Sequence, residues 1–256
     1  MQLRVLETSE SVARLVALDL WESIEAGARR LGLATGRTMI DVYREFVELA
    51  EALPENWNWS GIQTYNLDEY VGLGPQNSRS FHYFMQQHLF LPLALDNAHT
   101  HVPNGLAPDL ERECQEYEEI ATESPIDVQL LGLGINGHIG FNEPGTPFSS
   151  TTHMVDLSGA TLQQNAPDFD GSEPPGKALT MGIQTILNAR RIMLVATGIA
   201  KAQALEALLY GPVGTECPAS ALRLHPQVSV YVDRALMDGV LERQQSKEVP
   251  THEIRV

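Results

Sequence analysis

The sequence has few cysteines, few basic residues and no long apolar segment. Its two cysteines, Cys114 and Cys217, are too few for a disulfide framework, so we expect a reduced, cytoplasmic chain. The first ten residues lack the apolar core of a signal peptide, and no apolar run approaches the length of a membrane-spanning helix. These absences argue against a secreted, disulfide-stabilised protein and against a membrane protein, and they predict a soluble one.

The scarcity of basic residues makes the chain strongly acidic. It has 17 lysines and arginines against 33 aspartates and glutamates, a net charge of −16 over 256 residues. Because polyanions would be repelled, we expect neither nucleic acid nor an anionic membrane as a partner. A small anionic substrate is still compatible with this charge, since the field inside a site can oppose the global one. The hydrophobic fraction of 43% is enough for a substantial core.

Strand-like and helix-like hydrophobic patterns alternate along the chain. Strand-like runs cover residues 31–34, 62–67, 99–102, 128–133, 191–197 and 228–232. Helix-like segments cover residues 9–29, 39–52, 80–90, 108–122 and 201–210. This alternation predicts a doubly wound, Rossmann-like α/β fold, with a mostly parallel sheet and helices on both faces. No linker-like segment interrupts the pattern, so a single domain over residues 1–256 is expected.

One long segment departs from the alternation. Residues 146–177 are rich in serine, threonine, glycine and proline, and their periodicity is weak. A long irregular segment inside a compact domain is usually a lid or a binding loop. We therefore predict a lid within about residues 146–177.

The most informative segment is residues 128–145, an apolar run that ends in a glycine-rich loop. Asn136, His138 and Glu143 follow one another closely in that loop. Open α/β sheets build their sites at the carboxyl ends of strands, so these side chains are candidates for catalysis. Glu143 is expected to hold the imidazole of His138 in one tautomer and to raise its basicity, while Asn136 supplies a neutral donor and acceptor. The alternative is a structural histidine, which is the commoner role of an isolated one.

Two adjacent carboxylates, Asp68 and Glu69, follow the strand-like run at residues 62–67. Side chains alternate along a strand, so one carboxylate would face the site while the other makes a structural contact. A helix cap or a surface acid is an equally weighted alternative for the pair.

Two turns share the sequence Ala-Thr-Gly, and each lies between a strand and a helix. A helix N-terminus with free backbone N–H groups, hydroxyls and a cation is a ready anion site. The alternative is an ordinary turn capped by a threonine, with a solvated lysine in the second turn. If the turns converge, they would bind a single phosphate group through Thr35, Gly36, Arg37, Thr38 and Lys201.

The histidines give no convincing evidence for a metal site. His99 and His101 lie two residues apart on one predicted strand, which is only a weak hint of metal ligation. We interpret this pair as structural and expect no metal.

Four blocks of this sequence resemble the glucosamine-6-phosphate deaminase (isomerase) family: residues 33–38, 66–73, 131–145 and 196–201. Weaker matches at residues 102–105 and 218–226 extend the resemblance over nearly the whole chain. The third block is specific, because the related 6-phosphogluconolactonases share its Gly-x-x-Gly-His core but lack the Phe-Asn-Glu-Pro-Gly continuation.

The resemblance implies conversion of glucosamine 6-phosphate to fructose 6-phosphate and ammonia, in aminosugar catabolism and without an organic cofactor. Asp68 would move a proton from C2 towards C1 through an enolamine, and His138 would move the proton that opens the sugar ring. Asn136 and Glu143 would orient and tune His138. The two Thr-Gly turns would hold the phosphate.

Three other functions remain open on the sequence. They are a 6-phosphogluconolactonase-type hydrolase, a deaminase for another phosphorylated aminosugar such as the galactosamine epimer, and a non-catalytic sugar-phosphate sensor. The sequence is compatible with a homo-oligomer but does not specify one.

Three departures from the family pattern carry expectations of their own. Position 136 is asparagine where some members have aspartate, which implies hydrogen bonding there in place of a third charge. Residues 165–169 lack the lid arginine that many relatives place on the phosphate, so phosphate affinity or substrate choice should differ. Residues 151–155 carry no basic residue except His153, so we expect no activation by N-acetylglucosamine 6-phosphate.

Overall fold

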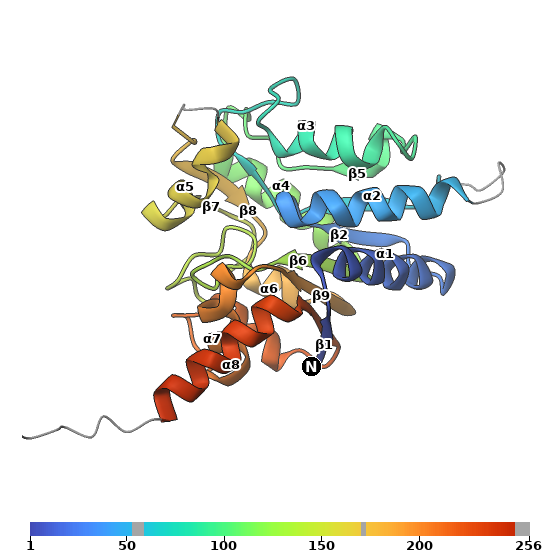
Figure 1. Ribbon diagram of the computed structural model, residues 1–256. Helices are drawn as coiled ribbons and strands as arrows, with labels where there is room; N and C mark the ends of the chain where they lie inside the picture. The colour runs from blue at the N-terminus through green and yellow to red at the C-terminus, as the bar shows by residue number, and fades with distance from the viewer. Residues whose placement is uncertain (53–58, 170–172, 249–256) are drawn as a thin grey trace, which may run out of the picture.

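A seven-stranded sheet forms the centre of the computed structural model, which describes residues 1–52, 59–169 and 173–248 (Figure 1). Every neighbouring pair in this sheet is parallel, as the alternating sequence pattern predicts. In order across the sheet the strands are β1 (Gln2–Leu6), β10 (Val228–Asp233), β9 (Arg191–Ala196), β6 (Val128–Gly132), β2 (Arg30–Leu33), β3 (Gln63–Asn66) and β5 (Thr100–His101).

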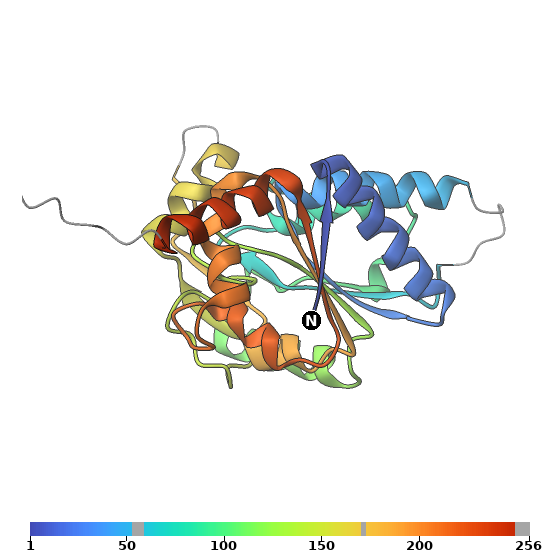
Figure 2. The same cartoon turned by 60° about the horizontal axis from the view of Figure 1, so that its bottom comes forward.

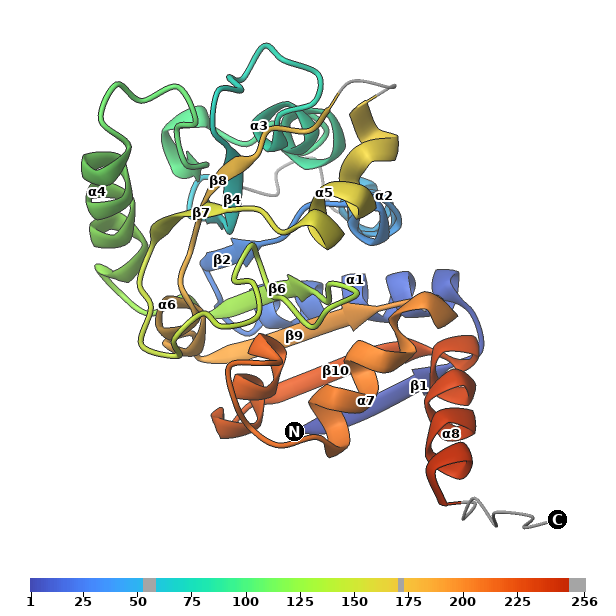
Figure 3. The ribbon, with the colours of Figure 1, turned by 90° about the vertical axis from the view of Figure 1, so that its left-hand side faces the viewer.

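Helices cover both faces of this sheet, as predicted. Figure 3 shows α7 in front of the strands and α1 behind them, and Figure 2 shows the same two layers after a different rotation. The α-helices are α1 (Ser9–Glu25), α2 (Arg37–Glu51), α3 (Phe81–Met85), α4 (Leu110–Thr122), α5 (Gly159–Asn165), α6 (Ile183–Leu187), α7 (Ala202–Tyr210) and α8 (Arg234–Glu248). Shorter 3-10 and π segments are η1 (Gln86–Phe90), η2 (Asn97–His99), η3 (Ala166–Phe169), η4 (Ile199–Lys201) and η5 (Pro218–Leu224).

The strand order changes direction between β2 and β6. From β2 the chain proceeds outward through β3 to β5, and from β6 it proceeds the other way through β9 to β10. At such a switch point the loops after the two central strands leave towards opposite faces of the sheet, which opens a crevice at their carboxyl ends. The glycine-rich loop that follows β6 therefore begins beside the turn that follows β2.

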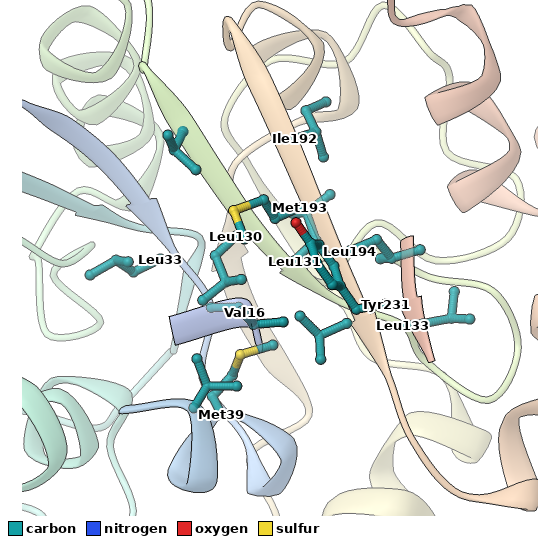
Figure 4. Packing of buried hydrophobic residues seen from close by; sticks show 14 of the residues in the cluster. Val16, Leu33, Met39, Leu130, Leu131, Leu133, Ile192, Met193, Leu194 and Tyr231 are labelled. Carbon is teal, nitrogen blue, oxygen red and sulfur yellow. The ribbon is translucent and has the colours of Figure 1, made fainter. Parts of the chain in front are cut away.

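The apolar core is centred on β6 and β9. Leu130 and Leu131 on β6, with Met193 and Leu194 on β9, are all fully buried, and Figure 4 shows them packed together. Both strands are nearly continuous apolar runs, because strands covered on both faces need apolar side chains on both sides. Each such side chain contributes about 1.5–3 kcal/mol on burial, so the strands that carry the candidate site are firmly held.

A second, three-stranded antiparallel sheet lies beside the first and was not predicted. It consists of β4 (Asp68–Tyr70), β8 (Lys177–Thr180) and β7 (His153–Asp156). A separate apolar cluster packs against it: Tyr70, Phe141, Leu157, Phe169 and Ala178. The small sheet links the Asp68 strand to the segment predicted as a lid.

The prediction of an irregular segment over residues 146–177 is partly wrong. This segment contains β7, α5 and η3, while its residues 170–172 lie outside the described part of the chain. Its short strand and helix have few apolar positions of their own, so periodicity does not reveal them. None of the described helices is long and apolar enough to cross a membrane.

Candidate active site

A cavity of about 500 Å³ opens at the carboxyl ends of the central strands. That volume lies within the range of about 300–1,000 Å³ that is usual for small-molecule sites. The predicted site residues that line it are Thr35, Gly36, Arg37, Thr38, Asp68, His138 and Lys201. Asn136 and Glu143 are not among the lining residues and instead support His138.

The turn after β2 presents the N-terminus of α2 to this cavity. Its N-cap is Gly36, whose φ of 101° is in the region that favours glycine. No side chain of the described residues caps this helix, and its first turn has no acidic residue. The alternative of a threonine cap is therefore wrong. Met39 N donates to Gly36 O at 2.9 Å, so the N–H groups of Arg37 and Thr38 are the ones left for an anion.

The second Ala-Thr-Gly turn brings Lys201 to the same cavity. Lys201 ends η4 and is the N-cap residue of α7. Burial lowers the pKa of its ammonium group, while the nearby carboxylate of Asp233 raises it. An anion bound in the cavity would offset the cost of keeping this half-buried group charged.

The absence of a side chain at Gly134 leaves the space that the imidazole of His138 fills. A Cβ atom at position 134 would lie 2.3 Å from His138 Cε1 and 2.4 Å from either ring nitrogen. Any residue larger than glycine would push the ring out of position. The loop is closed by a backbone hydrogen bond from Gly134 N to His138 O at 2.9 Å.

Asn136 connects His138 to Glu143. Its Nδ2 donates to Glu143 Oε2 at 2.8 Å, and its Oδ1 lies 2.7 Å from His138 Nδ1. A carboxylate only accepts, so the amide must turn its oxygen to the ring, and Nδ1 must carry the proton. Nε2 is then the unprotonated nitrogen of the neutral ring. The prediction that position 136 acts by hydrogen bonding is consistent with this arrangement.

Glu143 raises the pKa of His138, as expected, but the effect does not decide the net value. Burial is the larger effect and lowers the pKa of His138 to about 4. The Glu143 carboxylate also contacts the ring only through Asn136, since Glu143 Oε2 lies 3.9 Å from His138 Nδ1. His138 is therefore a neutral imidazole near pH 7.

Glu143 has further partners that sequence analysis did not identify. Burial raises its pKa, but hydrogen bonds from Thr161, Asn136 and Ser158, with the His138 charge, outweigh burial and bring the pKa below its ordinary value. Ser158 N donates to Glu143 Oε1 at 3.2 Å, and Thr161 Oγ1 lies 3.4 Å from His138 Nδ1. Both residues come from the start of α5, so the segment predicted as a lid is tied to the glycine-rich loop.

Asp68 and Glu69 divide their roles as predicted. Asp68 lines the cavity and is only 6% exposed, and burial, with the charge of Glu69, raises its pKa to about 8. Glu69 points away and accepts hydrogen bonds from the backbone N–H groups of Tyr70, Phe81 and His82. Glu69 thus fixes the start of α3 against the Asp68 strand.

Two charged lining residues had no signal in the sequence. Arg79 and Asp168 come from the segment before α3 and from η3. Asp168 pairs with Arg37, and the Arg79 guanidinium lies 5.7 Å from the ring centroid of Phe169. Because these residues lie far apart in the chain, no short motif could have joined them to the site.

No group of three or more metal-ligating side chains occurs within residues 1–52, 59–169 and 173–248. In the histidine pair interpreted as structural, His101 stacks on Tyr65 with ring centroids 4.8 Å apart. That contact accounts for His101 as a packing residue.

Comparison with known proteins adds to this geometry. The family model described as glucosamine-6-phosphate isomerases/6-phosphogluconolactonase matches residues 6–231. The chain belongs to this family. The family expected from the four sequence blocks is thereby confirmed.

Curated relatives in this family are similar over most of the chain. A glucosamine-6-phosphate deaminase of Lactobacillus delbrueckii is 42% identical, covering 92% of this chain and 97% of the relative. The deaminase of Shouchella clausii is 46% identical, covering 88% of this chain and 91% of the relative.

Solved structures of family members share the fold. A monomeric glucosamine-6-phosphate deaminase superposes with a TM-score of 0.88 at 42% identity, covering 93% of this chain and 99% of that one. A 6-phosphogluconolactonase from Trypanosoma brucei gives a TM-score of 0.73 at 18% identity, covering 93% and 98%. At that identity the second likeness concerns the fold alone.

Proposed function

We propose that this chain converts glucosamine 6-phosphate to fructose 6-phosphate and ammonia. The observation that carries the proposal is one cavity holding a buried carboxyl group with a raised pKa, Asp68, and a neutral imidazole, His138. Two helix-opening turns with cationic side chains lie in the same cavity. Relatives that are 42–46% identical over most of the chain are named glucosamine-6-phosphate deaminase.

Ring opening falls to His138. Its unprotonated Nε2 takes the proton of the C1 hydroxyl and returns a proton to the ring oxygen as the C1–O5 bond breaks. The product is the open-chain aldehyde. Asn136 and Glu143 hold the imidazole in the tautomer that this step requires.

Isomerisation and deamination fall to Asp68. Its carboxylate removes the proton from C2 while the C1 carbonyl oxygen takes up a proton, which gives an enolamine. Asp68 then delivers its proton to C1, and loss of a proton from the amino nitrogen leaves an imine at C2. One water molecule hydrolyses the imine to fructose 6-phosphate and ammonia. A pKa of about 8 suits the task, because a base poised near the working pH both accepts and returns a proton readily.

The phosphate group binds at the two Thr-Gly turns. The N-terminus of α2, the hydroxyls of Thr35 and Thr38, and the charges of Arg37 and Lys201 all favour a dianion there. This local positive charge opposes the field of the acidic net charge of −16.

The segment 146–177 acts as a lid over this site. In its described part, Asn165 Nδ2 donates to the Tyr70 hydroxyl at 2.8 Å, and Phe169 is buried against Tyr70. A segment docked on the cavity wall would exclude water from the enolamine.

An ammonia-release assay tests the proposal. Purified protein is given glucosamine 6-phosphate, galactosamine 6-phosphate or 6-phosphogluconolactone, and ammonia, fructose 6-phosphate and lactone hydrolysis are followed. We expect ammonia from glucosamine 6-phosphate and loss of at least about a hundredfold in Asp68→Asn and His138→Gln, the scale of removing a positioned acid–base group. Asp238→Asn, an exposed carboxylate on α8, is the matched control and should retain full activity.

Other outcomes distinguish the alternatives. Hydrolysis of the lactone without ammonia release would replace the proposal with a hydrolase. Ammonia from the galactosamine epimer alone would change the substrate. Binding of phosphosugars with no turnover of any of the three compounds would identify a sensor.

A further inference from the structure

An ion pair crosses the mouth of the cavity between Arg37 and Asp168. The Arg37 Nε and Nη2 atoms donate to Asp168 Oδ1 at 3.0 and 2.7 Å. Arg37 is the first residue of α2, at the turn where the phosphate is expected, and Asp168 belongs to η3. Figures 1 and 3 show α5, which precedes η3, near the N-terminal end of α2. A carboxylate of the protein is therefore already paired with one of the cations of the proposed anion site.

The backbone that presents Asp168 is docked on the cavity wall on both sides. On one side, Asn165 donates to the Tyr70 hydroxyl. On the other, Phe169 is 3% exposed and packs edge-on against Tyr70, with ring centroids 5.4 Å apart. These two contacts fix the backbone of Asp168 at a position from which its side chain reaches Arg37.

The pair itself is weak enough to be exchanged. The Arg37 and Asp168 side chains are 67% and 52% exposed, and ion pairs at this exposure are strongly screened by water. A phosphate ester carries up to two negative charges and three acceptor oxygens against the single charge of the carboxylate. It also gains the N–H groups of the α2 N-terminus, which Asp168 is not seen to contact.

We propose that Asp168 is an affinity-determining residue, an internal anion that competes with the substrate phosphate for Arg37. The inference rests on the proposed function only in that a phosphate group enters this end of the cavity. Binding of the phosphate releases Asp168 from Arg37, and the docked η3 segment loses one of its contacts with α2. Phosphate binding and the position of the segment are therefore linked, and by reciprocity removing the contact strengthens phosphate binding.

Calorimetric titration with inorganic phosphate tests the inference without requiring turnover. Asp168→Asn keeps the side-chain shape and removes the charge, and we expect phosphate to bind about two- to fivefold more tightly, the size of an exposed ion pair. The KM for glucosamine 6-phosphate should fall by a similar factor. Asp156→Asn is the matched control, because Asp156 lies on β7 in the same segment and faces Lys177, 3.6 Å away.

A double-mutant cycle identifies the partner. In the Arg37→Gln background, Asp168→Asn should leave phosphate affinity unchanged, because the contact is already absent. Unchanged or weaker phosphate binding in Asp168→Asn alone would overturn the inference, as would an equal gain in Asp156→Asn. A gain that persists in the Arg37→Gln background would also overturn it. Because the readout is phosphate binding, these results stand whether or not ammonia release confirms the proposed function.

Discussion

Asp68 illustrates how burial sets chemistry at the scale of one residue. Its carboxyl group is removed from water and lies beside the charge of Glu69, and both effects raise its pKa, to about 8. The catalytic form of a base is the deprotonated one, which is populated above that pKa. We therefore predict that kcat/KM falls as the pH drops below about 8, approaching tenfold per pH unit well below it.

Rates measured from pH 6 to 9 check this prediction. His138, whose pKa burial lowers to about 4, should add no transition in that range. Asp41→Asn, on the exposed side of α2, serves as the control and should keep the profile unchanged. A profile that is flat down to pH 6 would show that a carboxylate of ordinary pKa is the base.

Helix α3 shows how a single buried side chain can position a whole element. Glu69 accepts from Tyr70 N at 2.8 Å, Phe81 N at 3.0 Å and His82 N at 2.9 Å. Glu69→Gln would replace one acceptor oxygen with an NH₂ group, which cannot accept a hydrogen bond from these backbone N–H groups. We predict a loss of about 3 kcal/mol in the free energy of unfolding, from buried donors left without an acceptor. The KM should rise as well, because Arg79 and Ser80 line the cavity just before this helix.

Denaturant unfolding at pH 8 measures the stability change. Glu25→Gln replaces an exposed glutamate at the end of α1 and should alter stability by less than about 0.5 kcal/mol. A loss below about 1 kcal/mol in Glu69→Gln would mean that its three hydrogen bonds are not what holds α3 in place.

Elements were predicted well where the main sheet is covered on both faces, and poorly at its β1 edge and in the small antiparallel sheet. The runs at residues 128–133 and 191–197 became β6 and β9, since a fully buried strand must be apolar throughout. Edge strand β1 was missed because its residues are exposed or half-buried and form no apolar run. Strands β4 and β7 are short, and their pairing with β8 depends on chain segments far away in the sequence.

At the scale of the whole molecule, the prediction that stays open concerns regulation. Residues 151–155 carry a single histidine, and its Nδ1 lies 2.8 Å from the Thr151 carbonyl oxygen. A phosphorylated effector needs cations, and an acidic chain with none at this position would repel it. We predict that N-acetylglucosamine 6-phosphate leaves the half-saturating concentration of glucosamine 6-phosphate unchanged within about twofold.

Steady-state rates with increasing effector provide the measurement, and glucose 6-phosphate at equal concentration controls for simple competition at the phosphate site. A several-fold fall in half-saturating substrate with the effector alone would contradict the prediction.

The sequence by itself determined the parallel sheet, the family and the side chains that we propose for proton transfer. These features are local: an apolar run becomes a buried strand, and glycines beside a histidine create a loop wherever the strand ends. Only the tertiary structure decided that burial lowers the pKa of His138, against the rise expected from Glu143. It also decided that Asp168 meets Arg37 across 131 positions of the chain. Desolvation and long-range contacts depend on what surrounds a side chain in space, and residue spacing does not encode them.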